Sequence, residues 1–236
     1  SIDLPIKLLI MSKESDSLIS LERVLGLTAL SSAAVAASPS GDLFYAAGCV
    51  CVQYSPTTNK QLRVFNAQKP ISCAAVSTCG KYLAIGERGH NPCVCIYSIA
   101  SGTIITRLAG HKHGISCMVF SPDSKHLVTC GFKHDKQLLL WEWDPHHGSP
   151  PPAAGSSAVT SSSERSPAAS STRPLCTAKI GSKVYAVDFH ESGSYFVTCG
   201  DRHFKFWTVQ RAGGDGRRGT IVGLTGAPGT ITQELT

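Results

Sequence analysis

Residues 110–141 read GHKHGISCMVFSPDSKHLVTCGFKHDKQLLLW, and this stretch decides the fold. It contains apolar runs at 115–120, 127–130 and 137–141, which have the length of β-strands. The turn Ser-Pro-Asp-Ser at 121–124 can reverse the chain tightly, because Pro pre-sets φ and Asp tolerates the reversal. The stretch therefore predicts a β-meander.

The same order of strand, tight turn, strand and strand occurs in four units along the chain. The turns end at Gly41, Gly80, Ser124 and Gly193, and the third strands end at Tyr54, Tyr97, Trp141 and Trp207. Successive turns are 39, 44 and 69 residues apart. A period near 40 residues is typical of a β-propeller. No stretch reads as a capped amphipathic helix, so we expect an all-β fold: a partial propeller of about four blades, an open arc of a larger one.

The long third step is explained by an insertion at 145–174, where Pro, Ser, Ala and Gly dominate. Such a segment cannot bury enough apolar surface to offset its ordering entropy, so we expect a disordered loop. We expect a flexible N-terminal segment at 1–20 and the propeller fragment at 21–210. Within that fragment, the run 23–27 is interpreted as an outer-edge strand.

The Gly-rich tail at 211–236 is expected to lead to a further blade, with 220–224 as a strand candidate. An open arc has exposed sheet edges, which are sticky and weakly protected. Since the sequence also lacks an initiator Met, we expect it to be a piece of a longer protein.

The third unit resembles the consensus of WD-repeat proteins, because it carries His111, Thr129, Asp135 and Trp141 in the consensus order. The resemblance implies that these four side chains form a buried hydrogen-bonded set. This is physically reasonable, since polar groups are tolerated in a protein interior only when they are paired.

The other units depart from this consensus. The fourth retains Thr198, Asp201 and Trp207, with Ile180 at the position of the His. The second has Asn91 and Tyr97 in place of Asp and Trp, and the first keeps only Tyr54, with Gly48 at the acidic position. We therefore expect these blades to depend more on apolar packing.

A closer resemblance rests on irregular loops: AGCVCV from Ala47, GERGHNP from Gly86, GFKHD from Gly131 and GDRHFKFW from Gly200. Over residues 21–207 the chain resembles the N-terminal propeller of the WD-repeat scaffold family of mitogen-activated protein kinase-binding protein 1 and its spindle-pole paralogue. The insertion is a departure from that pattern. In this family the kinase-docking stretch lies far downstream of the propeller, so the resemblance implies that this chain lacks it.

The resemblance implies a non-catalytic protein-interaction scaffold of c-Jun N-terminal kinase signalling or spindle-pole organisation. Its partners would be proteins, and its location cytoplasmic or at the centrosome and spindle pole. The alternative is a substrate-recognition adaptor of a ubiquitin ligase or another multiprotein complex, because function in such folds lies in grafted surface sites. We expect no cofactor.

Composition argues against other classes of partner. The formal charge of +6, from 22 basic and 16 acidic residues, has no dense cationic stripe, so we expect no nucleic acid. The apolar run at 6–11 is interrupted by Lys7 and is too short to span a bilayer, so we expect no membrane partner. Ten cysteines without a signal peptide indicate reduced thiols in a cytosolic protein.

Cysteine pairs at 49/51 and 93/95 raise the question of a metal site. Their spacing is wrong for a zinc finger or ribbon, so we interpret them as small buried apolar residues and expect no metal.

Three histidines, His111, His134 and His203, raise the question of catalysis. No trio of nucleophile, base and orienting group can be nominated, and no GxSxG, HExxH or phosphate-binding loop occurs. We therefore expect no enzyme.

Ser149 and Ser166 each precede Pro in the insertion, which is the form that proline-directed kinases modify. Phosphate there would add charge without disturbing the core. The alternative is a silent linker.

Overall fold

The computed structural model describes residues 21–28, 31–143, 173–212 and 220–228. The segment expected at 1–20 and nearly all of the insertion, with Ser149 and Ser166, lie outside the described residues. Apart from the short 3-10 turn η1 (Ser32–Ala34), the regular structure in the described part is entirely β. Its strands form four antiparallel sheets of four strands each.

Each sheet is a meander in which sequential strands are neighbours. The first sheet contains β1 (Val35–Ala37), β2 (Leu43–Ala47), β3 (Val50–Ser55) and β4 (Lys60–Asn66). The second contains β5 (Ile71–Val76), β6 (Tyr82–Glu87), β7 (Cys93–Ser98) and β8 (Ile104–Ala109). The third contains β9 (Ile115–Phe120), β10 (His126–Gly131), β11 (Gln137–Glu142) and β12 (Cys176–Lys179). The fourth contains β13 (Val184–Phe189), β14 (Tyr195–Gly200), β15 (His203–Ala212) and β16 (Thr220–Pro228).

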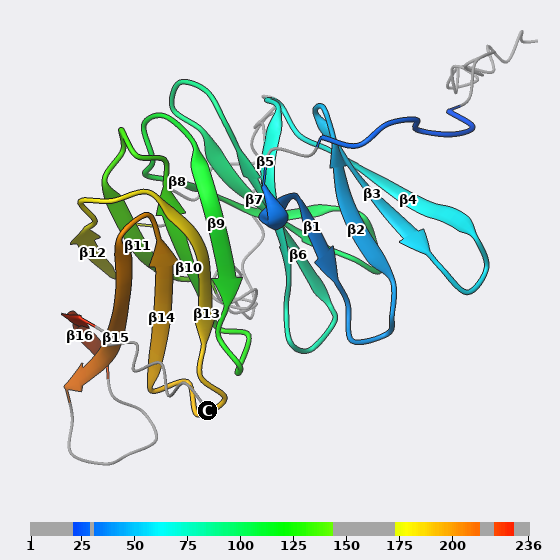
Figure 1. The fold of residues 1–236 in the computed structure, drawn as a ribbon. Coiled ribbons are helices and arrows are strands. Elements are labelled where there is room, and N and C mark those ends of the chain that lie inside the picture. Colours follow the sequence, from blue (N-terminus) through cyan, green and yellow to red (C-terminus); the bar gives the residue numbers. More distant parts are fainter. Residues whose placement is uncertain (1–20, 29–30, 144–172, 213–219, 229–236) are drawn as a thin grey trace, which may run out of the picture.

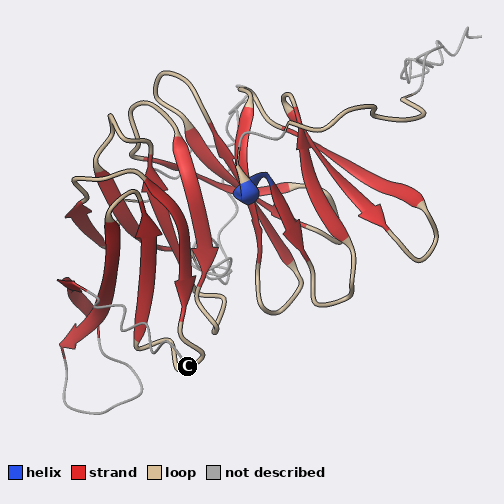
Figure 2. Ribbon diagram, viewed as in Figure 1, coloured by secondary structure: helices blue, strands red, loops and turns tan. Residues whose placement is uncertain are grey.

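The sheets fan out from a common centre (Figure 1), and Figure 2 shows that strands make up nearly all of the ordered elements. The first strands of successive sheets, β1, β5, β9 and β13, contact one another in that order. The turn η1 lies at the centre and contacts β5, β9 and β13. This radial arrangement confirms the expected partial β-propeller.

The aromatic residue that closes each third strand occupies the same register position in every sheet. In each sheet it lies directly across from the first or second residue of the second strand. The cross-strand pairs are Tyr54 with Leu43, Tyr97 with Leu83, Trp141 with Leu127, and Trp207 with Phe196. The sequence repeat is therefore a structural repeat.

The core consists of three apolar clusters, each between two adjacent sheets. Strand β11 shows how one sheet serves two of them. Leu139 and Trp141 belong to the cluster with the second sheet, whereas Leu138 and Leu140 belong to the cluster with the fourth. Because alternate residues of a strand point to opposite faces, a continuous apolar strand is what a sheet with two buried faces requires.

One of two expectations about segments outside the repeats was wrong. The run 23–27 is not a strand; Val24 instead exchanges hydrogen bonds with the side chain of Gln61, and Leu25 is 83% exposed. The strand expected at 220–224 is present as β16, and it pairs with β15 as the outer strand of the fourth sheet. That the tail leads on to a further blade stays a prediction. The long β15 offers an unpaired edge, and the returning chain satisfies its backbone groups.

Replacement of Leu127 by Ala tests the inter-sheet core. Leu127 is fully buried between the second and third sheets, so the loss of its side chain should lower the unfolding free energy by about 2–5 kcal/mol. The half-exposed Leu62 of β4 is the control, and Leu62→Ala should change that energy by no more than about 0.5 kcal/mol. Chemical denaturation measures both. Equal effects would contradict the assignment of Leu127 to the core.

Candidate functional site

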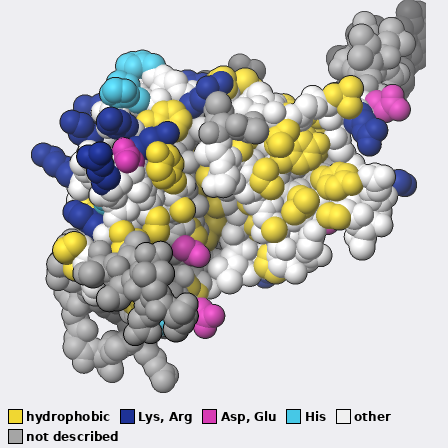
Figure 3. Space-filling view, in the orientation of Figure 1, with side chains coloured by type: hydrophobic (Ala, Val, Ile, Leu, Met, Phe, Trp, Pro, Cys, Tyr) yellow, Lys and Arg dark blue, Asp and Glu magenta, His cyan; other side chains and the backbone are white. Residues whose placement is uncertain are grey.

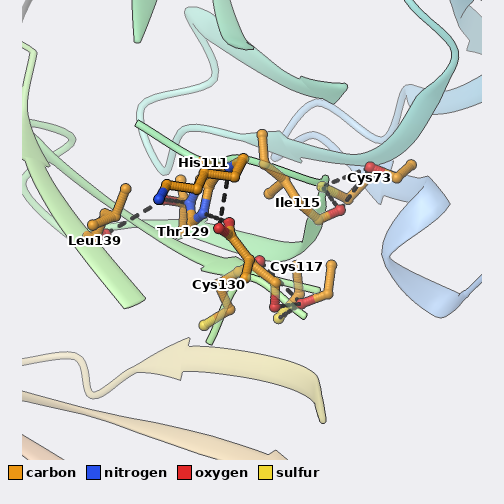
Figure 4. Close-up of polar contacts among 12 residues, drawn as sticks. Cys73, His111, Ile115, Cys117, Thr129, Cys130 and Leu139 are labelled. Carbon is orange, nitrogen blue, oxygen red and sulfur yellow. Dashed lines mark hydrogen bonds and ion pairs between the residues drawn. The ribbon is translucent and has the colours of Figure 1, made fainter. Parts of the chain in front are cut away.

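Four side chains of the third blade form one continuous buried hydrogen-bonded set, of which Figure 4 labels His111 and Thr129. His111, in the loop between β8 and β9, places Nδ1 2.5 Å from Asp135 Oδ2 and Nε2 2.8 Å from Thr129 Oγ1. Trp141 Nε1 donates to the same Thr129 oxygen at 2.9 Å. Asp135 also accepts the backbone N–H of Lys112 at 3.1 Å. The structure thus brings His111, Thr129, Asp135 and Trp141 together.

One proton arrangement satisfies every member of this set. Trp141 donates to Thr129, the Thr129 hydroxyl donates to His111 Nε2, and His111 Nδ1–H donates to Asp135. The set joins two strands, β10 and β11, to the loops 110–114 and 132–136. Its physical effect is to hold these two loops at fixed positions on the end of the sheet.

Gly110 is required by the same packing. A Cβ at this position would lie 2.8 Å from the Trp141 ring and 2.9 Å from Leu139. Because Gly110 has no side chain, the loop that carries His111 can lie directly against the indole.

The environment of Asp135 favours its charged form. Burial acts to raise the pKa of this carboxyl, but the hydrogen bonds from His111 and from the Lys112 amide outweigh burial and hold the pKa below its ordinary value. The ionised carboxylate is therefore part of the folded structure.

The fourth blade completes its set with a different histidine. Trp207 Nε1 donates to Thr198 Oγ1 at 2.8 Å, and the same hydroxyl lies 2.7 Å from His203 Nε2. Asp201 is exposed and uses its backbone N–H to bond Lys183 O. Ile180, at the usual histidine position, is buried in the apolar cluster with Trp207. Thr198 and Trp207 thus lie together as the sequence suggested, whereas His203 supplies a role that the sequence reasoning missed.

The second blade uses a buried glutamate that sequence reasoning also missed. Glu87 is 1% exposed, and its carboxylate accepts the backbone N–H groups of Gln68, Lys69 and Cys93 at 3.0, 3.3 and 3.1 Å. The available signal was a charged residue at the end of an apolar strand. Tyr97 donates to Asn66 O and thereby ties the second sheet to the first.

Five of the ten cysteines are buried. The expectation that both cysteine pairs are buried holds for Cys51 and Cys95, whereas Cys49 is exposed and Cys93 is partly buried. All ten cysteines are free. Cys117 and Cys130 face each other across β9 and β10 (Figure 4). Burial raises the pKa of Cys51 and of Cys95 to about 12, which disfavours thiolate ligands at the two cysteine pairs. Within the described residues, no group of three or more His, Cys, Asp or Glu side chains is arranged to hold a metal ion.

The loops held by these polar sets surround a cavity of about 670 Å³. Its lining comes from the turn η1 and the second, third and fourth sheets, and includes Ser32, Arg88, Phe132, Lys133 and Lys183. A concave site where several elements meet is the usual place for binding. No helix in the described part is long and apolar enough to cross a membrane.

The family model of the WD domain, G-beta repeat, matches residues 102–142 and 174–208. Each match begins at or just before the fourth strand of one sheet and ends in the third strand of the next, so one repeat joins two blades.

Similar proteins cover nearly the whole chain. WD repeat-containing protein 62 of Mus musculus is 35% identical over 217 residues, which are 91% of this chain and 12% of that protein. Mitogen-activated protein kinase-binding protein 1 of Mus musculus is 34% identical over 227 residues, 94% of this chain and 13% of that protein. Cilia- and flagella-associated protein 52 of Mus musculus is 28% identical over 102 residues, 42% of this chain and 16% of that protein. The chain thus spans about an eighth of the length of the first two relatives.

Thr129→Val tests the hydrogen-bonded set of the third blade. The substitution keeps the shape but leaves the Trp141 and His111 nitrogens without a buried partner, so the unfolding free energy should fall by about 2–4 kcal/mol. Thr177→Val at an exposed site of β12 is the matched control and should stay within about 0.5 kcal/mol. Indistinguishable denaturation midpoints for the two variants would show that the set does not stabilise the blade.

Asp135→Asn should change how stability depends on pH. Since the folded pKa of Asp135 is lowered, its contribution is present above the unfolded pKa of about 4 and is lost as pH falls through the folded pKa. The stability difference between the native chain and this variant should be largest near neutrality and shrink below about pH 4. Denaturation at a series of pH values, with exposed Glu142→Gln as control, measures it. A difference independent of pH would contradict this role.

Proposed function

Because the chain is a WD-repeat protein homologous over most of its length to WD repeat-containing protein 62 and mitogen-activated protein kinase-binding protein 1, we propose that it is a non-catalytic protein-interaction scaffold. Its binding surface is the end of the sheets that carries the loops 88–92, 110–114, 132–136 and 180–183. We call this end the loop face.

The proposal is supported by the role of a buried His–Asp pair, formed by His111 and Asp135. A His beside an Asp is also an arrangement found in catalytic sites. Here the side chains of His111 and Asp135 are 1% and 0% exposed, and both ring nitrogens of His111 are occupied within the blade. A substrate has no access to this pair, so its chemistry serves to fix loops.

Fixed loops favour recognition of other proteins, because a surface that is already ordered loses little conformational entropy on binding. We propose that the partners are components of mitogen-activated protein kinase signalling or of the spindle pole. One relative is named for binding a mitogen-activated protein kinase, and this supports the first class of partner. The corresponding location would be the cytoplasm, with a fraction at the centrosome.

Binding of purified candidate partners to the immobilised 236-residue chain tests this proposal. We expect saturable binding of at least one kinase-pathway or spindle-pole component, and no binding to chain unfolded in denaturant. Binding only to ubiquitin-ligase subunits would replace the scaffold by the adaptor alternative. Turnover of a small substrate that is abolished by His111→Ala would overturn the non-catalytic assignment.

A further inference from the structure

The two ends of the sheets differ strongly in charge. Strands alternate in direction, so every second loop opens at the same end of the arc. The described loops at the loop face contain two acidic residues, Asp135 and Asp201, and the basic residues Lys69, Arg88, Lys112, Lys133, Lys136, Lys183 and Arg202. The described loops at the opposite end contain the basic residues Lys81, Lys125 and Arg173 and the acidic residues Asp42, Asp123 and Glu191. Figure 3 shows Lys, Arg and His side chains gathered at the upper left, over the ends of the third and fourth sheets.

The cavity lies within this cationic surface. Three of its lining residues are basic: Arg88 from the second blade, Lys133 from the third, and Lys183 at the start of the fourth. Phe132, Val184 and Tyr185 add apolar surface between them. The cavity therefore combines cationic groups from three blades with an apolar wall.

These cationic groups are not neutralised within the described part of the chain. Its two ion pairs, His111–Asp135 and His126–Asp123, involve none of the three. The acidic residue nearest in sequence to Lys133 is Asp135, which is buried and bonded to His111 and Lys112. Lys183 lies over the ring of Tyr185, with Nζ 4.9 Å from the ring centroid. Unpaired charges of one sign in a concave site attract a ligand of the opposite sign.

The walls of the cavity are built to stay in place. Arg88 forms a bridge with Gly114 and donates its backbone N–H to Pro70 O at 2.9 Å. Phe132 donates its N–H to Gly114 O, and its ring lies where a Cβ on Gly114 would be. The loops bearing Arg88 and Lys133 are therefore both tied to the loop that His111 and Asp135 hold.

We propose that this cavity binds an acidic segment of a partner protein, in which carboxylates engage Arg88, Lys133 and Lys183 and an apolar side chain contacts Phe132 and Tyr185. The inference rests on the proposed scaffold function and names the chemistry of its partner. A volume of about 670 Å³ accommodates a few side chains. The cations surround one cavity instead of forming the extended track that a phosphate backbone follows, and this favours a peptide over a nucleic acid.

The experiment is a fluorescence-anisotropy titration of the 236-residue chain with a labelled peptide of Glu and Leu residues. The test variant is Arg88→Glu with Lys183→Glu. The control, Lys81→Glu with Lys125→Glu, makes the same change in net charge at the opposite end. Equal thermal midpoints establish that both variants are folded. We expect about a tenfold or greater loss of affinity in the test variant and less than about a twofold change in the control.

Peptide and nucleic acid are separated by two further titrations. A labelled peptide with Gln in place of Glu should bind much more weakly. Unlabelled single-stranded oligothymidine, added at a concentration equal to that of the Glu peptide, should not displace that peptide. Equal losses in both variants, equal binding of the Gln peptide, or stronger binding of oligothymidine would overturn the inference.

The same variant separates this inference from the proposed function. If the test variant still binds the protein partners of the intact chain at full strength, the cavity is not the recognition site and the scaffold function stands. If the intact chain binds no protein partner, the scaffold function itself fails, whatever the peptide titration gives.

Discussion

The stacking of one four-stranded sheet on the next is the constraint on which the structure depends. A sheet with two apolar faces must cover both, and here each interior sheet does so with its two neighbours. The alternation in β11 makes this explicit, since Leu139 and Trp141 face one neighbour while Leu138 and Leu140 face the other. Stacking fixes the positions of the sheets, and this is what allows the hydrogen-bonded sets to hold the loops at one end of the sheets.

The polar sets show how one structural role can be filled by different residues. In the third blade His111 reaches Thr129 from the loop before the first strand of its sheet, whereas in the fourth blade His203 reaches Thr198 from the start of the third strand. In the second blade Glu87 collects three loop amides. What these arrangements share is the outcome: buried donors and acceptors are paired, and the loops above the sheet are held.

The architecture could be predicted from the sequence because each blade repeats the same strand and turn chemistry, and because its closing aromatic is easy to recognise. The hydrogen bonds of His203 with Thr198 and of Glu87 with three loop amides could not be predicted from the sequence. They depend on which side chains meet in space, and the order of residues in the chain does not give this. The apolar run 23–27 suggested a strand, yet Leu25 is exposed and the backbone there bonds to the Gln61 side chain. Local hydrophobicity cannot reveal whether a neighbouring sheet edge is available for pairing.

The radial stacking is tested most directly by a double-mutant cycle across one sheet interface. Tyr82 of the second sheet and Trp143, which follows the third strand of the third sheet, have ring centroids 4.6 Å apart in an edge-to-face arrangement. Unfolding free energies of Tyr82→Ala, Trp143→Ala and the double variant give their coupling. A favourable coupling of about 0.5–1.5 kcal/mol is the result that stacked sheets predict. Strict additivity of the two substitutions would contradict the stacking of these two sheets.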